Sequence, residues 1–310
     1  MAYYPHLPDC QVAVRLPIVP IVLIVGALAL GALWGMQPSS ARAQAQDTTM
    51  YRAETADGNV YIGTIVSESD EEVVLNTKLV GTITIARADI ERMRAIDPGR
   101  MRDGAYWFEN PQATRYLFAP NAIGLPEGGG YYQNTWIFLN NVNVGVSDNV
   151  SIGAGTVPVF LLGASALPFW LLPKVSISTP SDRFHLAAGG VIGGVVGDGE
   201  SIGAGLVYGL STVGTRDNNV SVGLGYGYAG SDWSSRPVLN ISGLTRVGRT
   251  IYLLAENYVF PGSEPSGVVS VGVRWAPENF AVDFGLVRPL DVEGGFVGVP
   301  WLGVTIPFGQ

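Results

Sequence analysis

The chain has 310 residues, of which 47% are hydrophobic and 14% are charged, and it contains 41 glycines and a single cysteine. This length accommodates one large domain and a small one, and the apolar content argues against an intrinsically disordered chain. The formal net charge of −8 and the lack of any run of Lys or Arg argue against a nucleic-acid partner, because phosphate binding requires a basic face.

Residues 1–43 are predicted to form a signal peptide. An apolar stretch at 16–36 follows Arg15, and the sequence ARA at 41–43 is typical of a signal-peptidase site. The alternative is an uncleaved membrane anchor, because about 20 apolar residues span a bilayer. Cys10 precedes the apolar stretch, so cleavage would leave a chain without disulfides or thiolate chemistry.

Residues 48–98 are predicted to form a small periplasmic β module. Four short alternating segments are separated by turn-forming pairs such as Asp57-Gly58, and the segment DIERMRAI follows as a fifth strand or a short helix. Five short strands in about 50 residues favour a small SH3-like or Sm-like barrel. The segment DGNVYIGTI resembles the first strand pair of Sm-type proteins, with Gly63 permitting the bend. An acidic, exported module is not expected to bind RNA, and its periplasmic partner is unknown.

Residues 99–112 are predicted to be a linker. They carry the aromatic cluster Tyr106-Trp107-Phe108, which either lies at a membrane interface or packs against the small module.

Residues 113–310 alternate large apolar residues with very small ones in segments of about ten residues. In 220–228, Val, Leu and Tyr alternate with Ser and Gly, and 201–211 repeats the pattern with Leu206, Tyr208 and Leu210. This pattern is typical of a transmembrane antiparallel β-barrel, with the large residues facing lipid and the small ones facing the lumen. The alternative, a soluble sandwich, would place charged residues on its water-facing side. The only lysines in the sequence after residue 43 are Lys78 and Lys174, so lysine is nearly absent from these strands.

The turns predict twelve strands, with ten as the alternative. Five compact polar turns, near residues 148, 181, 217, 248 and 278, join ten strands, and 297–308 forms a last one. Residues 132–147 are interpreted as one strand. A periplasmic N-terminal module requires one further strand, which residues 114–120 can supply, followed by an outer loop at 121–130.

The C-terminal segment shows a resemblance to a known class. Its alternating apolar residues are Leu302, Val304, Ile306 and Phe308. Only two residues follow this last aromatic. This segment resembles the assembly signal of bacterial outer-membrane β-barrel proteins, which the barrel-insertion machinery reads, although in that signal the aromatic is terminal. Residues 113–310 are similar to this class, including uncharacterised exported proteins. The resemblance implies contact with membrane lipid in the outer membrane of a Gram-negative bacterium.

The sequence offers no group suited to catalysis or metal binding. His185 is the one histidine after residue 43, and it has no serine nearby of the kind that outer-membrane phospholipases place beside theirs. A metal site would have this single histidine and no cysteine to draw on. Neither enzymatic activity nor a cofactor is expected.

Charged residues on the small-residue faces predict a lumenal network of Glu256, Arg274 and Asp283, with Asn240 and Arg246. A four-residue turn at 276–279 would place Arg274 opposite Ala281 and diagonal to Asp283, within reach of an arginine side chain. The network either neutralises charge inside a narrow barrel or selects solutes by charge at a constriction.

Two functions follow from these predictions. The first is a passive, porin-like pore for small solutes, whose lumen is lined by Gly, Ser and Ala. The second is a closed structural barrel whose periplasmic module or outer loops bind a partner. A channel conducts ions and a closed barrel does not, so conductance separates the two.

Overall fold

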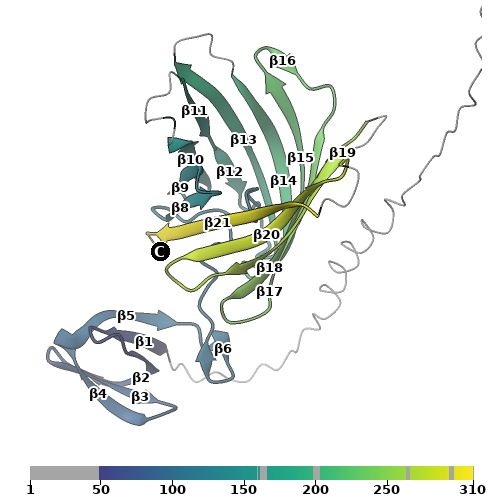
Figure 1. Cartoon of the computed structure of the whole chain (residues 1–310). Helices are drawn as coiled ribbons and strands as arrows, with labels where there is room; N and C mark the ends of the chain where they lie inside the picture. Colours follow the sequence, from purple (N-terminus) through teal and green to yellow (C-terminus); the bar gives the residue numbers. More distant parts are fainter. Residues whose placement is uncertain are drawn as a thin grey trace, which may run out of the picture. The chain divides into compact units, whose positions relative to one another are not determined.

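The computed structural model describes residues 49–158, 160, 166–197, 203–262, 266–292 and 297–309. The predicted signal peptide lies outside the described residues. The described chain is all-β, and it forms a five-stranded antiparallel sheet and a separate closed antiparallel barrel (Figure 1). Within the described ranges, no helix is both long and apolar enough to cross a membrane.

The small module is one sheet with the strand order β4-β3-β2-β1-β5. Its strands are β1 (Met50–Thr55), β2 (Val60–Glu68), β3 (Glu72–Thr77), β4 (Gly81–Ala86) and β5 (Ile90–Ile96). The segment DIERMRAI therefore contains a strand. A side chain at Gly63 would place its Cβ 2.4 Å from the carbonyl oxygen of Asn76, so the close approach of β2 and β3 requires glycine there. The resemblance to SH3-like or Sm-like barrels stays a prediction.

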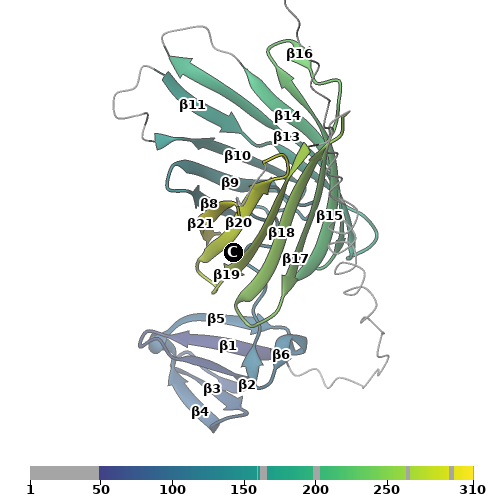
Figure 2. The same ribbon diagram turned by 45° about the vertical axis from the view of Figure 1, so that its right-hand side comes forward.

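The barrel is a sheet closed by the pairing of its last strand with its first (Figures 1 and 2). Its strands are β8 (Gly130–Thr135), β9 (Leu139–Ser147), β10 (Val150–Thr156), β11 (Ala166–Leu171), β12 (Lys174–Ile177), β13 (Phe184–Gly197), β14 (Ala204–Gly214), β15 (Asn218–Ala229), β17 (Val238–Arg246), β18 (Ile251–Phe260), β19 (Ser266–Trp275), β20 (Ala281–Pro289) and β21 (Val299–Phe308). Both β11 and β12 lie between β10 and β13, so they form one strand position interrupted at Leu172-Pro173. The barrel thus has twelve strand positions, as the sequence predicts. The short elements β6 (Met101–Arg102) and β7 (Ala105–Tyr106) precede it, and β16 (Asp232–Trp233) pairs with β15.

The predicted and observed strands differ at the N-terminal side of the barrel. Residues 114–120 form no barrel strand and contain only an isolated bridge between Arg115 and Pro120. Residues 132–147, predicted as one strand, contain most of β8 and all of β9, which are joined by a tight turn at Trp136 and Ile137 with φ of 52° and 68°. The two errors cancel in the total.

The outer face of the barrel is apolar. Exposed large hydrophobic side chains recur at every second position, among them Val222, Leu224, Val271, Val273, Phe284, Leu286, Leu302, Val304, Ile306 and Phe308. The predicted faces of β14 are wrong, however. Val207 and Val213 are exposed, whereas Leu210 is buried.

The pairing of β14 with β15 explains the reversal. Tyr208 lies opposite Gly225 and Leu210 lies opposite Gly223, so each large inward side chain faces an inward glycine on the next strand. A Cβ at Gly223 would come within 2.6 Å of Leu210 Cδ2. The glycines of β15 therefore make room for the side chains of β14 as well as widening the lumen.

Candidate functional site: a plugged lumen

Residues 108–125, here called the plug, fill part of the barrel lumen. Phe108, Tyr116, Leu117, Ala122 and Leu125 are all buried. The plug begins at the end of the barrel that carries the compact turns. There Asn110 Nδ2 donates to the carbonyl oxygen of Arg216 at 2.9 Å, in the turn between β14 and β15.

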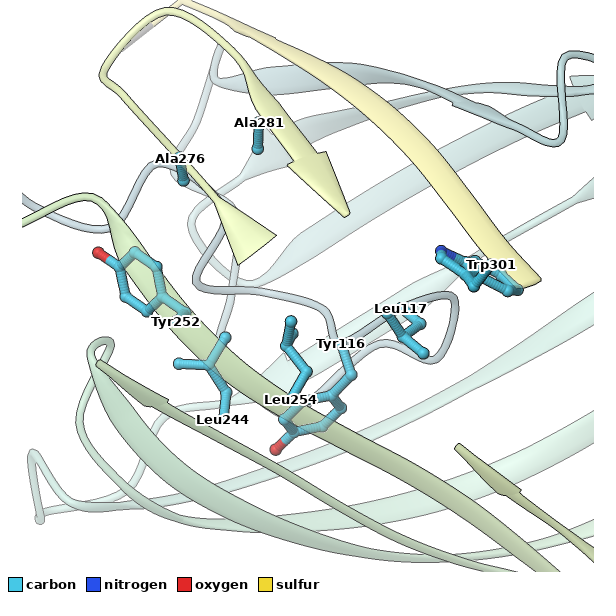
Figure 3. Close-up of a cluster of buried hydrophobic side chains, with 8 residues drawn as sticks. All are labelled: Tyr116, Leu117, Leu244, Tyr252, Leu254, Ala276, Ala281 and Trp301. Atoms are coloured by element: carbon cyan, nitrogen blue, oxygen red, sulfur yellow. The ribbon is translucent and has the colours of Figure 1, made fainter. Parts of the chain in front are cut away.

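The middle of the plug packs in the main apolar core of the barrel. Tyr116 and Leu117 lie among side chains from several strands and one turn (Figure 3): Leu244, Tyr252, Leu254, Ala276, Ala281 and Trp301. The core is thus formed between the plug and the inner wall. Burial of these side chains contributes to the stability of the plugged state.

Arg115 of the plug is joined to the wall by a buried ionic group. Asp283 on β20 accepts from Arg274 Nε at 2.6 Å and from Arg274 Nη2 at 3.0 Å, and its Oδ2 lies 3.1 Å from Arg115 Nη1. All three side chains are at most 1% exposed. One carboxylate therefore pairs with two guanidinium groups, and the bidentate contact fixes the position of Arg274.

The second positive charge of this group is stabilised by peptide carbonyls of the plug. Arg274 donates to the carbonyl oxygens of Gln112 at 3.0 Å and Tyr116 at 2.5 Å. Arg115 donates to the carbonyl oxygen of Leu117 at 2.9 Å and also to Thr305 Oγ1 on β21. The lumenal arginine of β19 thereby binds the backbone of the plug.

Glu256 on β18 also binds the plug and does not contact Arg274. Its Oε2 accepts from the backbone N–H groups of Phe118 at 2.9 Å and Ala119 at 3.0 Å. Its other oxygen accepts from the Tyr258 hydroxyl at 2.9 Å. The carboxylate thus satisfies buried backbone donors that would otherwise lack partners.

Other wall residues bind the plug in the same way. Lys174 Nζ donates to the carbonyl oxygens of Asn121 at 3.1 Å and Ile123 at 2.8 Å. Gln133 Nε2 donates to the carbonyl oxygen of Leu117 at 2.9 Å.

Two more hydrogen bonds connect the plug to β14 and β15. The Tyr116 hydroxyl donates to Asn219 Oδ1 at 2.7 Å, and the Ala122 N–H donates to Thr212 Oγ1 at 2.8 Å. Burial raises the pKa of the Tyr116 phenol above its ordinary value, so the hydroxyl stays protonated as a donor. The plug therefore contacts strands around the barrel, namely β8, β12, β14, β15, β18, β19, β20 and β21.

Arg246 lies at the compact-turn end, next to the start of the plug. It donates to the carbonyl oxygen of Phe108 at 2.8 Å and to Asp217 Oδ1 at 3.0 Å, and it lies 4.9 Å from the centre of the Trp107 ring. This contact places Trp107 of the aromatic cluster against the barrel.

The structure brings together only two of the five residues predicted to form a network. Arg274 lies directly opposite Asp283, and Trp275 lies opposite Val282, so the predicted pairing of Arg274 with Ala281 is wrong by two residues. The longer connection between β19 and β20 causes the difference. Glu256, Arg246 and Asn240 each have other partners, and Asn240 bonds to the carbonyl oxygen of Asn257 and to Ser242.

The residues of the predicted assembly signal lie on the last strand. Leu302, Val304, Ile306 and Phe308 point outward from β21, which closes the barrel against β8. Their role in insertion stays a prediction. His185 lies on β13, and no cluster of metal-ligating side chains occurs among the described residues.

A cavity of about 150 Å³ lies in the lumen beside the plug. Leu206, Val238 and Tyr258 of its wall lie toward the strand ends that carry the longer connections. Phe118, Ala119 and Pro120 of the plug line it as well. The lumen of the described barrel thus contains a plug bound by polar wall groups, and a mainly apolar cavity next to it.

Sequence reasoning missed the plug. The usable signal is composition, because residues 114–120 carry Arg115 and Pro120 and follow the polar residues Asn110 and Gln112. Length gives no signal, since β8 and β10 of the wall have only six and seven residues. A segment of this composition fits better inside a lumen than in its wall.

The chain matches no model of a known protein family and no curated protein. Among solved structures it is similar to the KdgM porin, with 7% sequence identity and a TM-score of 0.43 over 59% of this chain and 99% of that chain. It is also similar to a KdgM porin in complex with disordered oligogalacturonate, with 7% identity and a TM-score of 0.41 over 59% of this chain and 98% of that one. A loop L8 deletion mutant of OmpT, an outer membrane protein of Vibrio cholerae, has 12% identity and a TM-score of 0.33 over 84% of this chain and 96% of its own. At these values the likeness concerns barrel architecture alone.

Proposed function

We propose that the protein is a porin-like barrel of the bacterial outer membrane whose lumen is closed at rest by the plug. The single observation that carries this proposal is the ion pair between Arg115 of the plug and Asp283 of the inner wall. The side chain of Arg115 is 0% exposed. A passive, permanently open pore would leave these lumenal charges in water.

The outer face supports the membrane location. In a barrel that spans a membrane, outward residues contact lipid and alternate with lumenal ones. The exposed Val, Leu, Ile and Phe side chains of β15, β19, β20 and β21 meet this condition. A closed ring of strands also leaves no unpaired sheet edge in the hydrocarbon region of the membrane. Each backbone N–H or C=O group without a hydrogen-bond partner there would cost several kcal/mol.

The chain connections support one orientation. Barrels of this class have short periplasmic turns and longer outer loops. The compact turns, such as Asp148-Asn149 between β9 and β10, lie at the end where the plug starts and where β8 and β21 meet at Gly130 and Phe308. We therefore place the start of the plug, and the small module that precedes it, in the periplasm.

The test is the conductance of the purified protein in a planar lipid bilayer. We expect the unaltered protein to be closed most of the time. We expect a variant with both Arg115→Ala and Glu256→Ala to open, because it loses one plug anchor of each charge and the net charge of the lumen is unchanged.

Arg288→Ala is the matched control. Arg288 is an exposed residue on β20, the strand that carries Asp283, and its replacement should leave the closed state unchanged. Steady conductance of the unaltered protein, equal to that of the double variant, would contradict the proposal.

A further inference from the structure

The cavity beside the plug contains a buried lysine without a carboxylate partner. Lys174 is 6% exposed and lines the cavity. The two acceptors of its ammonium group are the uncharged carbonyl oxygens of Asn121 and Ile123, which leaves one N–H unused. Among the described residues, no Asp or Glu forms an ion pair with Lys174. A buried charge is costly unless it is paired, so an anion bound at this position would stabilise the ammonium form of Lys174.

Two amide side chains in the same cavity also have unused polar atoms. Asn141 Oδ1 and Asn143 Nδ2 are buried and have no hydrogen-bond partner, and their residues are 4% and 8% exposed. The side chain of Asn143 lies over Gly153 of β10, because a Cβ added at residue 153 would come within 2.1 Å of Asn143 Oδ1. The same Cβ would come within 3.1 Å of Leu172 Cβ, so the Asn143 amide leans across β10 toward Leu172. The next strand position beyond β10 is that of Lys174. Buried polar groups in native proteins are rarely left without partners, and a ligand is one way to supply them. Of these two atoms, only the donor Asn143 Nδ2 can bind an anion, because the Asn141 Oδ1 atom is an acceptor.

The remaining walls of the cavity are mostly apolar. Val191, Leu206, Leu210 and Val238 line it together with the rings of Tyr208 and Tyr258. The cavity volume of about 150 Å³ equals that of an apolar cavity that stays dry and binds benzene. The site therefore has space for an apolar body of about one six-membered ring.

From these three observations we propose that the cavity binds a small carboxylate with a compact apolar body. The carboxylate accepts hydrogen bonds from Lys174 Nζ and Asn143 Nδ2, and the apolar body lies against Leu206 and Leu210. This inference rests on the proposed closed lumen, because Phe118 and Ala119 of the plug form part of the cavity wall.

The test uses calorimetry to measure the binding of three probes to the full protein: benzoate, benzyl alcohol and benzylamine. All three carry one benzene ring and differ in the charge of the attached polar group. We expect benzoate to bind about tenfold or more tightly than benzyl alcohol, the factor that one charge-assisted hydrogen bond provides. Benzylamine should bind least, because it adds a second cation beside Lys174. Failure of every probe to bind would overturn the inference and leave the cavity to water.

Two variants and a control locate the site. Lys174→Met should remove the preference for benzoate over benzyl alcohol, a ratio that a general loosening of the plug would not change. Lys78→Met, at the other, exposed lysine in the small module, should leave it intact. Leu206→Trp should fill the cavity and block both probes. An unchanged preference in Lys174→Met, or unchanged binding in Leu206→Trp, would overturn the assignment.

The two proposals fail in different ways. Absent benzoate binding together with a closed barrel would overturn only the ligand site. Steady conductance of the unaltered protein would overturn the closed lumen, whatever the probes do.

Discussion

Asp283 is the residue on which the polar interior depends most. Among the described residues, its carboxylate is the one acidic group in contact with both Arg115 and Arg274, and all three side chains are buried. Buried ion pairs add little net stability compared with apolar residues, but removal of one partner is costly because it leaves an uncompensated charge.

We therefore predict that Asp283→Asn lowers the free energy of unfolding by about 3–5 kcal/mol, because two guanidinium groups would then face a neutral amide. Urea unfolding of the protein in lipid vesicles measures the loss. Arg288→Gln on the exposed face of the same strand should change it by no more than about 0.5 kcal/mol. A loss below about 1 kcal/mol for Asp283→Asn would show that the group is solvated or that the plug is not held there.

At the scale of single elements, the turn between β8 and β9 is conformationally unusual. Trp136 and Ile137 both have positive φ in the three-residue loop between Thr135 and Leu139. Two successive positive φ values in a hairpin loop are normally found at Asn and Gly. Trp136 is held in place by a hydrogen bond from its Nε1 to the carbonyl oxygen of Pro300 at 2.7 Å. Its ring also packs against that of Trp301, with 4.9 Å between the ring centres. Ile137 is 73% exposed and has little packing to offset the unfavourable φ.

We predict that Ile137→Gly raises the free energy of unfolding by about 0.5–1 kcal/mol. A β-branched residue in this region costs of order 1–3 kcal/mol, which exceeds the conformational entropy that glycine loses on folding. Ile137→Ala, which removes the same side chain without the freedom of glycine, is the matched control. The shift in the urea midpoint checks the prediction, and an equal shift in both variants would contradict the explanation by φ.

The alternation of residues in the strands predicts a barrel but not the direction of every face. For β15 the pattern gives the correct faces, because Val222 and Leu224 are exposed. For β14 the same rule fails, since Leu206, Tyr208 and Leu210 point toward the glycines of the next strand. Period-two patterns fix which residues share a face. Whether lipid or lumen takes the larger set depends on pairing partners that lie on another strand.

At the scale of the whole molecule, the lumen is built to hold a segment of its own chain. Glu256, Arg274 and Lys174 come from three different strands, and each bonds to backbone atoms of the plug. The sequence predicts that Glu256 and Arg274 face inward but not what they face, and it gives no such prediction for Lys174. A peptide backbone carries no sequence signature as a hydrogen-bond partner, so the inward side chains of the wall could not predict the plug.

The most direct test of the closed lumen is the reactivity of two single cysteines toward a polar maleimide in the folded, membrane-inserted protein, with Cys10 replaced by serine in both. Ala122→Cys lies in the buried plug, and Glu127→Cys lies just beyond it at an exposed position. We predict that Cys at 122 reacts at least about a hundredfold more slowly than Cys at 127, because it becomes accessible only when the plug leaves the lumen. Equal rates at the two positions would contradict a lumen closed by residues 108–125.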